Sequence, residues 1–106
     1  EVYKEIMEKL EYLIQNDSKH SLLLKETYKT IIQIFPYLTA GYNYFGVKGK
    51  VKLYNKVRML LSQLQSQVHI LHELKLFEKE YFEELESSIK YIGGLIKKVE
   101  GLPNEN

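Results

Sequence analysis

The sequence contains no cysteine and no tryptophan, and its 15 basic residues include a single arginine, Arg58. Without cysteine, disulfide bonds and cysteine-ligated metals are excluded, and a small chain without them is typical of a reducing, intracellular compartment. No run approaches the roughly 18 consecutive apolar residues of a membrane-spanning helix. We therefore expect a cytoplasmic protein without a transmembrane segment, although the initial Glu1 is compatible with removal of a leader or a preceding domain.

Motifs of catalysis and nucleotide binding are also missing. The chain has no Gly-x-Ser-x-Gly, no Walker loop and no Gly-x-Gly-x-x-Gly. His69 and His72 lie three residues apart beside Glu73, but metal sites in helical bundles draw such pairs from several helices. We therefore predict that the protein is not an enzyme, has no catalytic residues, and uses no metal or other cofactor.

Apolar residues recur at helical spacing in four segments of this 106-residue chain. The predicted helices cover about Val2–Gln15, Ser18 or Ser21 to Phe35, Lys50–His72 and Phe77–Glu100. Either serine could cap the second helix. Pro36 should end or kink that helix, because its ring clashes with the preceding turn.

Three glycines punctuate residues 37–49, which we therefore interpret as a loop. Four amphipathic segments without convincing strands predict an all-α fold, an antiparallel four-helix bundle. We expect residues 1–101 to form a single helical-bundle domain and residues 102–106 a flexible C-terminal tail.

The charges are unevenly distributed along the chain. Between Glu26 and Glu73 there is no acidic residue over 46 positions, whereas six basic residues fall there. The remaining residues carry 9 basic and 14 acidic side chains, so the formal charge of +1 conceals a basic middle and acidic ends. This distribution indicates a surface for phosphate, anionic lipid or an acidic partner, unless the glutamates of the fourth helix neutralise it.

The basic middle includes a segment, residues 42–58, in which aromatic rings alternate with lysines. Because Leu53 and Val57 should face the core, Lys52 and Lys56 should share an outer face with neither an acid nor an aromatic ring between them. Lysines at a helix N-terminus oppose the helix dipole, so their placement there suggests a role other than stability. The predicted binding residues for a partner or anion are Tyr42, Tyr44, Lys48, Lys50, Lys52, Lys56 and Arg58.

The predicted helices contain the stretches EIMEKLEYLIQND, KHSLLLKETYKTII, KLYNKVRMLLSQL, a connection containing LKLF, and the acidic EKEYFEELESSIKYIG. In this pattern the chain resembles the immunity proteins that protect producers of pediocin-like bacteriocins. The resemblance covers about residues 2–93. It implies a cytoplasmic antiparallel four-helix bundle without catalysis, which blocks the bacteriocin together with its membrane receptor, the mannose phosphotransferase permease. It also implies that the third and fourth helices and the tail carry specificity.

Three functional hypotheses follow. The first is a non-enzymatic bundle that binds a protein partner, specifically a bacteriocin immunity protein, through the basic-aromatic connection and the outer face of the third helix. The second is a small accessory protein that binds single-stranded nucleic acid or phosphate, with bases stacked on the rings of residues 42–58. The third is a helical interaction domain of a larger assembly, with an oligomer formed through the apolar stripe of the third helix.

Overall fold

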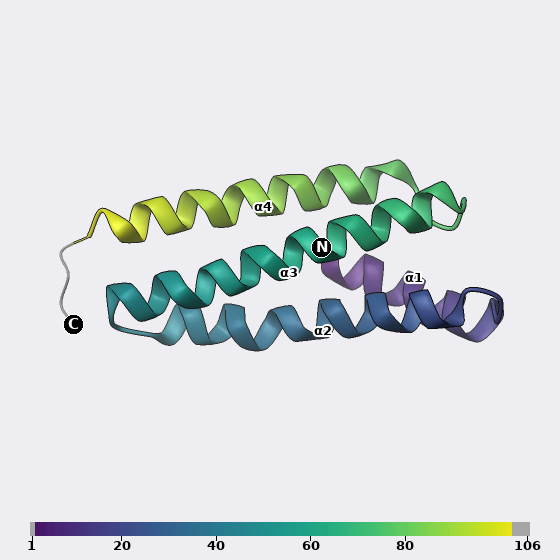
Figure 1. The fold of residues 1–106 in the computed structure, drawn as a ribbon, viewed down its shortest axis with the longest axis horizontal. Helices are drawn as coiled ribbons and strands as arrows, with labels where there is room; N and C mark the ends of the chain where they lie inside the picture. The colour runs from purple at the N-terminus through teal and green to yellow at the C-terminus, as the bar shows by residue number, and fades with distance from the viewer. Residues whose placement is uncertain (1, 103–106) are drawn as a thin grey trace.

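The protein is an antiparallel four-helix bundle in the computed structural model, which describes residues 2–102. Its helices are α1 (Val2–Asn16), α2 (Ser21–Asn43), α3 (Val47–Glu73) and α4 (Lys79–Glu100). Figure 1 shows α2, α3 and α4 side by side in alternating directions, while α1 packs against α2 and α4. The predicted all-α bundle is therefore confirmed. No helix within the described residues is long and apolar enough to cross a membrane.

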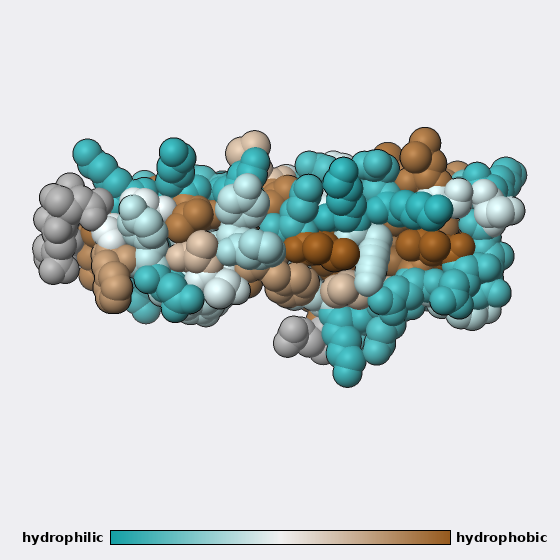
Figure 2. Space-filling view, turned by 90° about the horizontal axis from the view of Figure 1, so that it is seen from below, coloured by the Kyte–Doolittle hydropathy of each residue, from teal (hydrophilic) through white to brown (hydrophobic). Residues whose placement is uncertain are grey.

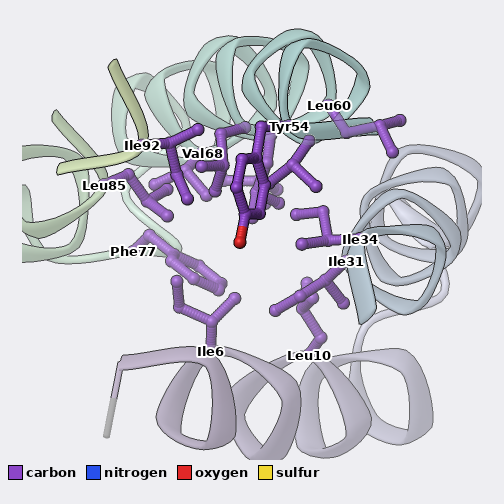
Figure 3. Packing of buried hydrophobic residues seen from close by; sticks show 14 of the residues in the cluster. Ile6, Leu10, Ile31, Ile34, Tyr54, Leu60, Val68, Phe77, Leu85 and Ile92 are labelled. Carbon is purple, nitrogen blue, oxygen red and sulfur yellow. The ribbon is translucent and has the colours of Figure 1, made fainter. Parts of the chain in front are cut away.

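A single apolar core runs along the bundle. Ile6 and Leu10 of α1 point towards α2 and α4, where they meet residues such as Ile31 and Phe77 (Figure 3). The buried Thr30 links α2 to α3 by a polar contact: its hydroxyl donates to Glu26 O at 3.1 Å and accepts from Gln63 Nε2 of α3 at 3.1 Å. Because burial of apolar surface is the main favourable term in folding, these helices stabilise one another.

The helices differ greatly in length. With a rise of about 1.5 Å per residue, α1 is about 22 Å long, whereas α3 is about 40 Å long. The bundle measures 51 × 21 × 19 Å, and α1 flanks only the half that contains the start of α2 and of α4 (Figure 1). The other half consists of α2, α3 and α4 alone.

The predicted end of the second helix at Pro36 is wrong, and so is the predicted loop at 37–49. α2 continues through Pro36 to Asn43, and α3 starts at Val47, so only residues 44–46 connect the two helices. Pro36 is exposed and removes one backbone donor. The extra turns of α2 offset that loss because they pack against α3, where Gly41 is buried beneath the Tyr54 ring.

The predicted serine cap of α2 is also wrong. His20 occupies the N-cap position without a side-chain hydrogen bond, and Ser21 is already helical. Asp17 orders the α1–α2 turn instead, since its carboxylate accepts a hydrogen bond from the His20 backbone N–H at 3.0 Å and lies 3.0 Å from His20 Nδ1. The side-chain bond to His20 lowers the pKa of Asp17. Most of the predicted tail, residues 103–106, lies outside the described residues.

Candidate binding surface

Antiparallel packing gathers basic residues from two distant parts of the chain. Residues 37–58, from late α2 to the middle of α3, lie in the same half of the bundle as residues 90–102, the end of α4 (Figure 1). We call these residues the basic half. It contains eight basic side chains and a single acidic one, Glu100, whereas the rest of the described chain contains seven basic and eleven acidic residues. Charge is therefore separated along the long axis of the bundle.

The glutamates of α4 do not neutralise the cations of α3. Within residues 2–102 the ion pairs are Lys9–Glu78 at 2.6 Å, His20–Asp17 at 3.0 Å and Lys90–Glu86 at 3.8 Å. None of them includes a residue of α3. The antiparallel direction explains this, because the acidic first turns of α4 lie beside the last turns of α3, at the far end from the cations.

Lys48, Lys52 and Lys56 follow one another at four-residue spacing on an exposed face of α3. Together with Tyr37 of α2 they border a shallow groove of about 690 Å³, which we call the lysine groove. The groove is lined by Tyr37, Lys48, Val51, Lys52, Leu53, Asn55, Lys56 and Met59. Its floor and walls are therefore largely apolar, and its charges are all positive.

A neighbouring helix brings an aromatic ring beside Lys56. Its ammonium lies 5.6 Å from the centroid of the Tyr37 ring, a distance at which the electron-rich face of the ring attracts a cation. The ring comes from the part of α2 beyond Pro36, which the sequence pattern assigned to a loop. The aromatic contact therefore holds one of the three lysines beside the groove.

Lys50 has a different role from the other predicted lysines. Its ammonium donates hydrogen bonds to the backbone oxygens of Gly41 at 2.7 Å and Tyr42 at 3.1 Å, in the last turn of α2. It also lies 5.6 Å from the centroid of the Tyr54 ring. A cation is favourable at a helix C-terminus. Lys50, predicted to oppose the dipole of its own helix, therefore neutralises the carboxyl end of the neighbouring helix.

The predicted tyrosines pack against the protein's own surface. Tyr42 contacts Tyr54 edge to face, with ring centroids 6.5 Å apart. The Tyr44 ring covers Gly49, where an added Cβ would overlap it. Tyr54 is only 2% exposed, and this burial, followed by the effects of Tyr42 and Tyr91, raises its pKa. Base stacking on Tyr54 is therefore blocked, whereas Tyr42 is 62% exposed, Tyr44 is 50% exposed and Phe45 is 98% exposed.

Arg58 lies in a second groove, formed where α3 and α4 meet. Asn55 and Lys97 also line this groove, and the floor on the α4 side is the Gly93-Gly94 pair. Apart from the chain neighbours and the local helix backbone, no heavy atom lies within 4 Å of the position that a Cβ would take at either glycine. The structure therefore separates Arg58 from the three lysines with which the sequence grouped it.

The histidines considered as metal ligands have other partners. His72 Nδ1 is 2.9 Å from the backbone oxygen of Phe77, and the His69 ring packs against Phe82 with centroids 5.5 Å apart. Both contacts join α3 to the start of α4. Among residues 2–102, no three histidine, cysteine, aspartate or glutamate side chains gather in a way that could hold a metal ion.

Sequence reasoning missed three basic residues of this surface. Lys90, Lys97 and Lys98 were assigned to α4 alone, and Tyr37 to a loop. The signal that would have found the lysines is topological, because an antiparallel neighbour brings the end of α4 beside the start of α3.

Comparison with known proteins found no relative: no family model, no curated protein and no solved structure matches this chain.

Proposed function

We propose that this protein is a non-enzymatic binding protein whose lysine groove accepts an acidic segment of a protein partner. One observation carries this proposal: three aligned lysines border an apolar groove and have no carboxylate of residues 2–102 within ion-pair distance. The proposal retains the cytoplasmic location and the absence of catalysis that the composition favours.

The shape and chemistry of the groove define the partner. Lysines at four-residue spacing match carboxylates that recur once per turn on an amphipathic helix, because one turn advances about 5.4 Å. Tyr37 and Met59 supply apolar contact area, and Met59 is 65% exposed. Methionine and aromatic side chains are enriched in the centre of protein interfaces, and complementary charge steers the encounter. The favoured partner segment is thus an acidic amphipathic helix.

The direct test is the binding of a fluorescent amphipathic peptide with one glutamate per turn, measured by anisotropy at low and high salt. Replacing Lys52 and Lys56 by glutamine should weaken binding about tenfold at low salt, since each exposed ion pair contributes up to about 1 kcal/mol. The matched control replaces Lys19 and Lys25, exposed lysines in the opposite half, and should leave binding unchanged. Equal losses in both variants would contradict the proposal.

Bacteriocin immunity is the specific form of this function that the resemblance implies. In that form the partner is the complex of a pediocin-like peptide with its membrane receptor. Expression in a sensitive strain, followed by challenge with a panel of such peptides, tests it. Protection by the wild-type protein that is lost in the Lys52 and Lys56 double variant supports immunity through the lysine groove. If the expressing strain is killed as before by every peptide of the panel, the immunity proposal is removed. The peptide-binding assay then tests the lysine groove separately.

Single-stranded nucleic acid fits the same surface less well. Stacking needs rings beside the cations, but Tyr54 is buried and one side of Tyr44 covers Gly49, which leaves Tyr42 as the more exposed tyrosine of the segment. A labelled oligonucleotide in the anisotropy assay separates the two hypotheses. Tight binding with a steep dependence on salt, lost when Tyr42 is replaced by alanine, would favour nucleic acid over an acidic protein segment.

A further inference from the structure

Phe45 is almost completely exposed. Its side chain has 98% of its surface accessible, the highest value of any large apolar residue in the described chain. It lies in the three-residue connection that joins α2 to α3 and forms part of one end of the bundle (Figure 1). At the same end, Leu102 follows the last turn of α4 and is 55% exposed. A single exposed apolar side chain is common on protein surfaces, so the charges around Phe45 decide what this ring could contact.

The surroundings of Phe45 are positively charged. Lys48 lies in the first turn of α3, and Lys97 and Lys98 lie in the last turn of α4. The amino end of α3, the positive end of its dipole, is also at this end. The negative carboxyl end of α2 is neutralised there by the Lys50 ammonium.

The opposite end of the bundle has a different chemical character. The first turns of α4 there are acidic, and Glu78 binds Lys9 of α1. Figure 2, a view from the α2 side, shows that apolar and hydrophilic side chains otherwise alternate over the long face, so apolar exposure alone does not mark the end with Phe45. The combination of a projecting aromatic ring, several cations and, among residues 37–58 and 90–102, the single carboxylate of Glu100 does mark it.

We propose that this end of the bundle docks on an anionic lipid bilayer, with Phe45 inserted at the boundary of headgroups and acyl chains. Aromatic side chains favour that boundary, and lysines near the surface are attracted by anionic lipids. Neither contribution is strong alone, and stable peripheral binding combines an apolar anchor with a basic cluster. A projecting side chain suits a bilayer better than a protein partner, whose recognition of this ring would require a deep pocket.

Co-sedimentation with phosphatidylcholine vesicles, with and without phosphatidylglycerol, tests this proposal on the full chain. Wild-type protein should sediment with the anionic vesicles only. Phe45→Ala should lower the partition coefficient about tenfold or more, because it removes the apolar anchor. The matched control is Leu22→Ala, which removes a side chain that is 76% exposed at the opposite end and should leave partitioning unchanged. Replacing Lys97 and Lys98 by glutamine should weaken binding about fivefold per charge.

Three outcomes would overturn membrane docking. The first is a wild-type protein that does not sediment with anionic vesicles. The second is an equal loss for Leu22→Ala and Phe45→Ala, since both substitutions change exposed side chains and keep the fold. The third is that Met59→Ala, in the lysine groove, reduces vesicle binding as much as Phe45→Ala does. That result would assign the vesicle signal to the groove. Two distinct surfaces are supported if Met59→Ala alone loses peptide binding and Phe45→Ala alone loses vesicle binding.

Discussion

Two glycine-to-alanine substitutions should change stability in opposite directions. Gly41 is buried in α2, where a Cβ would lie 2.7 Å from Cε1 and 2.9 Å from Cδ1 of Tyr54. The Tyr54 ring is 2% exposed, so it has little freedom to move away. Gly94 also lies within a helix, but beyond its chain neighbours and the local helix backbone no heavy atom is within 4 Å of its Cβ position. Alanine is favoured over glycine in a helix by about 1 kcal/mol.

Gly94→Ala should therefore stabilise the protein by about 0.5–1 kcal/mol, and Gly41→Ala should not. The helix propensity gain is common to both variants, so the difference between their unfolding free energies measures the overpacking against Tyr54. Overpacking a core typically costs about 1–3 kcal/mol. Urea unfolding with unchanged m values would report this difference as a shift in the midpoint.

A second background makes the reasoning specific to the ring. In a Tyr54→Leu protein the obstructing atoms are gone, so Gly41→Ala should be as favourable there as Gly94→Ala. The coupling between positions 41 and 54 would then account for the whole penalty. A Gly41→Ala midpoint equal to or above that of Gly94→Ala, in the wild-type background, would refute the packing of Tyr54 on the α2 backbone.

Three further predictions concern the ends and the interior of the helices. Lys50→Met should destabilise the protein by about 1 kcal/mol in urea unfolding, because it removes the cation from the α2 carboxyl end. The control variant Lys52→Met should change stability by less than about 0.5 kcal/mol. Pro36→Ala should raise stability by about 1–2 kcal/mol, since it restores a helical N–H at an exposed position, and a loss of stability would contradict an uninterrupted α2. The hydrogen bond from Lys9 holds the pKa of Glu78 below its ordinary value of 4.5. The stability that this ion pair contributes is therefore present above pH 4.5 and is lost as the pH falls through the folded-state pKa. The Lys9→Met variant should consequently show a weaker loss of stability on acidification than the wild type.

Periodicity predicted the helices because the core positions follow it closely. Ile31 and Ile34 of α2, and Leu64 and Val68 of α3, repeat at three- and four-residue spacing, and all four are fully buried. Local rules failed at Pro36. The proline penalty is a local cost of a few kcal/mol, but the contact that offsets it joins α2 to Tyr54, which lies 18 residues further along the chain. A rule that considers only neighbouring residues cannot include that contact.

The candidate site was predictable in part for the same reason. Lys52 and Lys56 share one exposed face because of spacing within a single helix, as the sequence predicted, but Lys48 was assigned to a loop and joins them only because α3 starts at Val47. The role of Lys50 depends on backbone oxygens of another helix. The contribution of Lys97 depends on the direction in which α4 returns. Both require tertiary structure, which spacing does not supply.

The central claim is that the lysines of α3 form an uncancelled cationic surface for an acidic partner segment. The most direct measurement is a two-dimensional amide NMR titration of the isotope-labelled protein with the acidic amphipathic peptide. We predict that perturbations concentrate at residues 48–59 and at Tyr37, and that they disappear when Lys48, Lys52 and Lys56 are replaced by glutamine. Perturbations that persist in that variant, or that spread evenly over all four helices, would contradict the account.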